Sequence, residues 1–300
     1  AAINAGTHQG DVTIAVTGNT TEPTTSVPLL KSASPSSYTS ILIIPSGGDW
    51  TINSGASPTA SRGVLEFFGA DNVTIDGDPA STGTRHLSIV VATTSNAGTA
   101  AIRLASTSTT GADGADNCII KNCNITGGRN SATSTTTSYG VVMSTSTSIS
   151  SGAYNSLNTR IENNLITRCY HGVYAPGASG YPNTGTKILN NTIGSATSAL
   201  NIGSRGILIT YSSTTAGANS ALISGNDIRV GTYETTGYGA TIAGIEIGTV
   251  NAGCTVTRNN IHDINQPSSS GYGAHGIYIT GSASNASIDI NNNFIRDCKM

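Results

Sequence analysis

Apolar and polar residues alternate in short segments that recur along most of the chain. Six of these segments end alike, with a final Ile preceded two positions earlier by Asn and five positions earlier by Ile or Val. Cys123 is the one exception at the Asn position. The final Ile residues occupy positions 125, 166, 193, 228, 261 and 295, so the steps between them are 41, 27, 35, 33 and 34 residues. Such a period predicts one supersecondary unit that is stacked many times.

A second motif lies between the first ones and consists of Gly, an apolar residue, a variable residue and a mostly apolar residue. It occurs at 140–143, 172–175, 206–209, 244–247 and 276–279. Alternation in β-branched sequence predicts a short strand with one buried face. Ser, Thr, Gly and Asn fill the intervening segments, and no window has a convincing helical period. Because the steps vary while the motifs stay constant, we expect loops of different length to leave a regular coil.

Stacking in parallel register is the arrangement that lets such coils bury their apolar faces. Neighbouring coils would lie about 4.8 Å apart, each covering the next. The recurrent Asn would then lie at one corner, where stacked side chains form a hydrogen-bonded ladder. A single Asn is equally well explained as an ordinary turn residue, but the shared offset favours a ladder. The predicted ladder is Asn164, Asn191, Asn226, Asn259 and Asn293, and the predicted buried column is Ile161, Ile188, Ile223, Val256 and Ile290.

Two known groups of proteins resemble this pattern. Residues 276–279 and 288–295 resemble the repeat of pectin-lyase-like proteins, and this resemblance extends over roughly residues 60–300. It implies an all-β fold, a right-handed parallel β-helix (solenoid) with loops of variable length leaving the coils. Four N-terminal segments are similar to large secreted bacterial surface proteins, many of them exported by the type IX route: 11–17, 41–45, 68–77 and 84–89. This second resemblance implies a secreted or cell-surface location in a bacterium.

The repeat also suggests how the chain is organised. We expect residues 1–60 to form N-terminal coils or a capping region and residues 61–300 to form the β-helix repeats, within one continuous elongated domain. Solenoid ends expose strand edges and apolar interior. We therefore expect a segment of a longer chain, with further coils, subunits or domains covering its ends. Residues 1–6 resemble the last turn of a helix, with Gly6 as its C-terminal cap.

Composition agrees with an extracellular stacked-β protein. Only 10% of the residues are charged and 5% are aromatic, and 36 of the 300 residues are Gly. The net charge of −2 provides no basic footprint for nucleic acid. No apolar run is long enough to span a membrane, so we expect no membrane insertion. The repeat places the five cysteines too far apart for most disulfides, so we expect mostly buried thiols.

The resemblance to pectin-lyase-like proteins implies that any chemistry would occur on the outer face of one sheet. The predicted outward column is Val142, Tyr174, Leu208, Glu246 and Tyr278, which contains a single acid. A glycosidase needs two carboxylates, and a lyase needs a base near groups that neutralise a uronate. Glu246, Arg205 and His275 are the candidate catalytic residues if neighbouring coils bring them together; otherwise they are scattered surface residues. Tyr174 and Tyr278 are the candidate ligand-binding residues, since sugar rings stack on exposed aromatic side chains.

The sequence implies no cofactor. Asp76 and Asp78 resemble a fragment of a Ca²⁺ loop, although turn chemistry explains the same pattern. Three functions remain open. The favoured hypothesis is a structural or adhesive β-helix segment of a secreted or cell-surface protein, without catalysis. The alternatives are a carbohydrate-active enzyme, either a polysaccharide lyase or a glycoside hydrolase, and a passive carbohydrate-binding module with polysaccharide as its partner.

Overall fold

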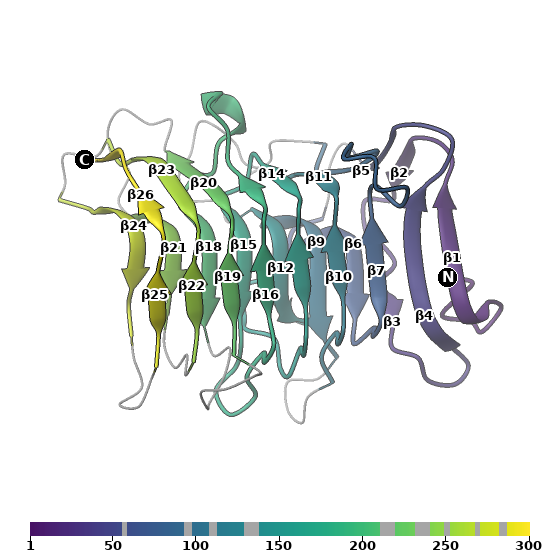
Figure 1. Ribbon diagram of the computed structural model, residues 1–300. Coiled ribbons are helices and arrows are strands. Elements are labelled where there is room, and N and C mark those ends of the chain that lie inside the picture. Colours follow the sequence, from purple (N-terminus) through teal and green to yellow (C-terminus); the bar gives the residue numbers. More distant parts are fainter. Residues whose placement is uncertain are drawn as a thin grey trace.

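The computed structural model describes residues 1–55, 59–92, 98–107, 113–128, 138–210, 220–231, 241–248, 253–267, 271–281 and 287–300. These residues form a right-handed parallel β-helix of three sheets, and successive coils stack along one axis from the N-terminus to the C-terminus (Figure 1). Neighbouring strands within each sheet pair in parallel and belong to adjacent coils. The only helical element in the described part is a 3₁₀ turn, η1 (Ser198–Leu200).

Each coil before the last contributes one strand to each sheet. Sheet A contains β1 (Gln9–Val16), β4 (Ser37–Pro45), β7 (Val73–Asp76), β10 (Ile119–Lys121), β13 (Arg160–Glu162), β16 (Lys187–Leu189), β19 (Leu222–Ser224), β22 (Thr255–Thr257) and β25 (Asp289–Asn291). Sheet B contains β2 (Thr20–Glu22), β5 (Trp50–Ser54), β8 (Leu87–Val90), β11 (Cys123–Thr126), β14 (Leu165–Thr167), β17 (Thr192–Ile193), β20 (Asp227–Gly231), β23 (Asn260–Asn265) and β26 (Phe294–Ile295), while β27 (Cys298–Lys299) also pairs with β23.

Sheet C carries the Gly motif. Its strands are β3 (Leu29–Leu30), β6 (Arg62–Phe68), β9 (Thr99–Ser106), β12 (Tyr139–Thr145), β15 (His171–Pro176), β18 (Arg205–Thr210), β21 (Ile242–Ile247) and β24 (Ala274–Ile279). At the N-terminal end, residues 1–7 form a turn. The amides of Gly6 and Thr7 donate to the carbonyls of Ile3 and Ala2, and Gly6 has a φ of 75°. This is the hydrogen-bond pattern of a Schellman C-cap.

A sharp corner divides each Asn-bearing segment between sheets A and B. The residue before the ladder position has a positive φ, which Asn and Gly adopt at low cost. In successive coils this residue is Asn122, Asn163, Asn190, Gly225, Arg258 and Asn292. The chain turns there, so the apolar residues on both sides of the corner point into the coil.

The asparagines that follow this corner are stacked directly on one another. The Nδ2 of Asn164 donates to the Oδ1 of Asn191 at 3.0 Å, and the same contact continues from Asn191 to Asn226, then to Asn259 and then to Asn293. Each Oδ1 also accepts the backbone amide of the ladder residue in the preceding coil. At the start of the ladder, the Oδ1 of Asn164 accepts the backbone amide of Cys123. The ladder thus satisfies backbone amides that the corner leaves without sheet partners.

The coil interior is a continuous apolar column. Ile161, Ile188, Ile223 and Val256 pair in register and are fully buried, but Ile290 in the same column is 41% exposed. The expectation that Ile290 is buried was wrong because its strand, β25, pairs only with β22 and no described strand covers its other side. Ile279, Phe294 and Ile295 are exposed at the same end of the helix.

The glycines of sheet C are required by the close approach of sheets B and C. A Cβ atom added at Gly206 would lie 2.4 Å from the Cγ2 of Ile228 and 2.5 Å from the carbonyl oxygen of Gly244. The equivalent glycines of neighbouring coils meet the final Ile of the sequence repeat in the same way. The two sequence motifs therefore pack against each other across the coil interior.

The cysteines are free thiols. Cys118, Cys123, Cys169 and Cys254 are buried, whereas Cys298 is exposed on the last coil. Burial raises the pKa of the Cys118, Cys123 and Cys254 thiols to about 12, so these three groups are protonated at neutral pH. They pack as small apolar side chains.

Candidate functional site

The outer face of sheet C brings together most of the candidate residues. Gly206 and Ile207 both face the interior, so the residues on either side of this pair, Arg205 and Leu208, point outward. The same bend recurs in each coil that carries the Gly motif. It creates two outward columns: Tyr139, His171, Arg205, Ala243 and His275 in one, and Val142, Tyr174, Leu208, Glu246 and Tyr278 in the other.

Four aromatic rings gather at the start of these columns. His171 stacks on Tyr174 with ring centroids 5.1 Å apart and on Tyr139 at 5.6 Å, and it meets Tyr170 edge-on at 4.6 Å. His171 is 9% exposed, and Tyr139 is 1% exposed. The Nδ1 atom of His171 is buried and has no hydrogen-bond partner within the described ranges. Burial, together with the nearby Arg205 charge, lowers the pKa of His171 to about 3, so its ring is neutral at physiological pH.

Arg205 and Glu246 lie on neighbouring coils and form an ion pair through Nε and Oε2. Their side chains are only 13% and 12% exposed. Nη1 of Arg205 also donates to Ser204 Oγ at 2.8 Å and to the carbonyl of Thr241, while Oε1 of Glu246 accepts from Thr280 Oγ1 at 3.2 Å. Both charged groups are thus tied by protein partners.

His275 lies apart from this ion pair. It follows Arg205 by two coil steps in its column, which corresponds to about 10 Å. Its ring stacks on Tyr278, with centroids 4.6 Å apart and planes inclined by 16°. Tyr174 and Tyr278 share the other column but are separated by three coil steps, or about 14 Å. The face therefore presents two aromatic groups with the Arg205–Glu246 pair between them.

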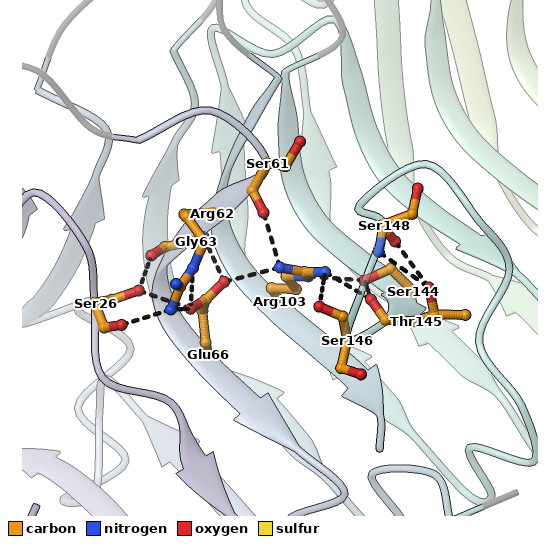
Figure 2. A network of polar contacts seen from close by, with 10 residues as sticks. All are labelled: Ser26, Ser61, Arg62, Gly63, Glu66, Arg103, Ser144, Thr145, Ser146 and Ser148. Atoms are coloured by element: carbon orange, nitrogen blue, oxygen red, sulfur yellow. Dashed lines mark hydrogen bonds and ion pairs between the residues drawn. The ribbon is translucent and has the colours of Figure 1, made fainter. Parts of the chain in front are cut away.

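A buried polar network covers the N-terminal end of the same face (Figure 2). Glu66, whose side chain is fully buried, accepts hydrogen bonds from Arg62, Arg103, Ser26 and the amide of Gly63. Arg103 is 1% exposed, and Figure 2 shows its guanidinium lying between Glu66 and the segment 144–146. It donates to Ser144 Oγ at 2.9 Å and to the carbonyls of residues 61, 145 and 146. Every nitrogen of this guanidinium has an acceptor, as a buried charge requires.

Sequence reasoning missed this network. Val64 and Ala101 occupy the place that Gly holds in later coils, so β6 and β9 do not show the Gly motif. The pairing of Glu66 with Arg103 and of Arg103 with Val142 shows that both charged residues belong to the outward column. An alignment that accepted any small or β-branched residue at the Gly position would have found them.

The carboxylates of Asp76 and Asp78 accept hydrogen bonds from protein donors. Asp76 accepts from the amide of Asp78 and from Asn122 Nδ2 and pairs with Lys121 Nζ at 3.1 Å. Asp78 accepts from Thr82 and from the amide of Gly83. The amide of Thr82 is the largest of the causes that lower the pKa of Asp78. Within the described ranges, no group of three or more His, Cys, Asp or Glu residues is arranged to hold a metal ion.

Sheet B carries a polar cleft that the sequence did not indicate. It has a volume of about 240 Å³, and its lining includes Asn201, Arg229 and Asp263. Behind it, His262 is 1% exposed and lies between two carboxylates, with Asp227 at 2.9 Å from Nε2 and Asp263 at 2.9 Å from Nδ1. Arg229, His262 and Asp263 directly follow the final Ile of their repeats, where a register shift between Arg229 and Val230 breaks the regular pattern.

A third charged group lies at the corner that leads into sheet A. Oδ1 of Asp71 accepts the amide of Asp116, and Oδ1 of Asp116 accepts the amide of Leu157. Asp113 pairs with Lys31 at 2.7 Å. Burial is the main reason that the pKa of Asp116 rises to about 6, and the nearby Asp71 and Asp113 charges add to it. Stacked asparagines, Asn72, Asn117 and Asn158, form the exposed edge of this corner.

The comparisons with known proteins find similar structures only. No known family matches the sequence, and no curated protein matches it. The A-module of mannuronan C-5 epimerase AlgE4 from Azotobacter vinelandii aligns with a TM-score of 0.47 and 11% identity, covering 100% of this chain and 91% of that chain. The Streptococcus pneumoniae surface protein and adhesin PfbA aligns with a TM-score of 0.39 and 13% identity, covering 97% and 89%. The Dettilon tailspike protein aligns with a TM-score of 0.36 and 13% identity, covering 96% and 55%.

These similarities concern the β-helix alone, and no activity is transferred from them. The described residues contain no helix that is long and apolar enough to cross a membrane. On the outer face of sheet C, two groups of aromatic rings lie on either side of one ion pair, and Val142 and Ala243 in the same columns are fully buried.

Proposed function

We propose that this chain is a structural or adhesive β-helix segment of a secreted or cell-surface bacterial protein and that it does not catalyse a reaction. Export by the type IX route belongs to the same proposal and rests on the N-terminal sequence segments. The low charge and the abundance of Ser and Thr support an extracellular rod.

The state of the acids in sheet C supports this proposal most directly. The strands of this sheet contain two acids, Glu66 and Glu246, and each is paired with arginine. Five coil steps separate them, or about 24 Å. A glycosidase places its two carboxylates roughly 5–9.5 Å apart. The two acids of sheet C therefore do not form a hydrolytic pair.

The acids of sheet B do not provide such a pair either. Asp227 and Asp263 lie near each other, but the ring of His262 is hydrogen-bonded between them. The His262 ring therefore fills the space between the two carboxylate oxygens that it contacts. His171 lies beside Arg205 in the column that the competing hypothesis of a carbohydrate-active enzyme would use, but a pKa of about 3 makes its imidazole a weak base at neutral pH.

The test is incubation of the purified chain with a panel of pectins, alginates, glycosaminoglycans and neutral glycans. New reducing ends and unsaturated uronate products would be measured after long incubation. We expect no product above that of a heat-denatured control. Product that disappears in His171→Phe or Glu246→Gln, with the variant still folded by circular dichroism, would contradict the proposal and establish the enzyme.

A further inference from the structure

The charge of the sheet C face indicates what it can bind. The five strands from β12 to β24 contain one cation and one carboxylate, Arg205 and Glu246, and these two groups neutralise each other. His171, the residue stacked between the tyrosines, is neutral at physiological pH because it is buried. The Arg205–Glu246 pair therefore adds no net charge to the strands of this face, which carry stacked aromatic rings at both ends.

Stacking surfaces of this kind suit sugar rings. Tyr174 and Tyr278 are half-buried and keep part of their surface toward solvent, and each is held by a stacked histidine, His171 or His275. Rings fixed in this way lose little conformational entropy on binding. Between them, the closed ion pair offers polar atoms that can exchange hydrogen bonds with hydroxyl groups but no free cation for a carboxylate.

We propose that the outer face of sheet C binds a neutral glycan and that Glu246 determines this specificity by occupying the guanidinium of Arg205. This inference rests on the proposed non-catalytic function and names the ligand class of the same surface. A polyuronate chain would have to break the Arg205–Glu246 pair and place its carboxylates beside Glu246. Like charges brought together in a partly buried site repel each other, which disfavours binding of a polyuronate.

Charge substitutions separate this proposal from a merely sticky surface. In Glu246→Gln, the side chain keeps its size and its acceptor for Thr280, but Arg205 loses its counter-ion. We expect this variant to gain binding to polygalacturonate by about tenfold, the effect of one new charge-assisted hydrogen bond. In the double variant Arg205→Gln/Glu246→Gln, the face is again uncharged, and the preference for neutral chains should return.

The experiment is affinity electrophoresis of the full 300-residue chain in gels that contain dextran, β-1,3-glucan, galactomannan, polygalacturonate or alginate. The wild-type chain should be retarded by at least one neutral glycan and by neither polyuronate. Tyr278→Leu should weaken the neutral retardation. Arg229→Gln, in the cleft on sheet B, is the matched control for removal of an arginine. It should change neither the retardation by neutral glycans nor the lack of retardation by polyuronates.

Three results would overturn the inference: stronger retardation of the wild-type chain by polyuronates than by neutral glycans, no gain in Glu246→Gln, or no retardation by any of the five polymers. These three results concern binding alone. A failure of the proposed non-catalytic function would appear instead as product formed from a polysaccharide, so the two failures are distinguishable. A variant that loses its β-sheet circular dichroism is replaced by Glu246→Met, which removes the same charge.

Discussion

Replacing Asn226 by Ala removes the central member of the asparagine ladder. Asn226 is fully buried, and its Oδ1 accepts both the backbone amide and the Nδ2 of Asn191, at 2.9 and 3.0 Å. Its Nδ2 donates to the carbonyl of Ile188 and to the Oδ1 of Asn259, both at 2.9 Å. In the variant, Oδ1 of Asn259 still accepts the backbone amide of residue 226, but three other buried groups lose this partner: two N–H groups of Asn191 and the carbonyl of Ile188.

Those three groups determine the expected loss of stability. An unsatisfied buried polar group costs about 1–3 kcal/mol, and water that enters the vacated space would satisfy part of the need, so we expect a loss of about 3–6 kcal/mol. Urea unfolding followed by far-ultraviolet circular dichroism would measure this loss. Native-state hydrogen exchange gives a local readout, because the backbone amide of Asn191 should exchange much faster in the variant.

Asn293→Ala is the matched control for this substitution. Asn293 accepts the same two contacts from Asn259 and donates to the carbonyl of Val256, but it lies on the terminal coil and is only partly buried. Water can replace its side chain there, so we expect a loss of about 1 kcal/mol or less. Equal losses for Asn226→Ala and Asn293→Ala, or unchanged exchange at Asn191, would refute the reasoning that the buried ladder stabilises the corner.

Four further predictions concern the core, two titrating groups and the exposed end. Ile223→Ala should destabilise the chain by about 2–5 kcal/mol in urea unfolding, and the exposed Ile290→Ala by clearly less; similar losses would contradict the buried column. The pKa of His171 is about 3 in the folded chain against an ordinary 6.5, so between these values the unfolded chain binds a proton that the folded chain does not. The free energy of unfolding should therefore fall as pH drops from about 6.5 toward 3. His171→Phe should remove this part of the pH dependence of the urea midpoint. Asp116 affects stability in the opposite direction, because its pKa is raised from 3.8 to about 6. Its contribution to the free energy of unfolding is present below pH 4 and is lost as pH rises through 6. Asp116→Asn should flatten the fall of stability over this pH range, and an unchanged fall would contradict the prediction. Phe294 is 62% exposed beside other apolar residues, so the chain should self-associate at high concentration in light scattering, and Phe294→Asp should reduce the association; a monodisperse wild-type chain would contradict this.

The sequence predicted the features that depend on the repeat. A constant offset from the final Ile was sufficient to place Asn191 and Asn226 in equivalent positions, because identical coils must stack in register. The Gly motif likewise predicted the outward column that contains Tyr174 and Glu246. These features follow from period and alternation, which a single sequence displays directly.

Features that depend on side chains from several coils were not predictable. The sequence placed His171 in an outward column, but its burial results from three tyrosines that pack around it. The grouping of Arg205 with His275 ignored the two coil steps between them. Glu66 and Arg103 escaped notice because the first coils replace the marker Gly by other residues. The sheet B cleft arises where the regular repeat is broken.

A crystal structure of the chain with a neutral oligosaccharide, taken from the polymer that retards it, tests the central claim most directly. The account predicts a sugar ring stacked on Tyr174 or Tyr278, with the Arg205–Glu246 ion pair intact beneath the oligosaccharide. A sugar bound instead in the cleft at Arg229, or a broken pair with Arg205 turned toward the ligand, would contradict it.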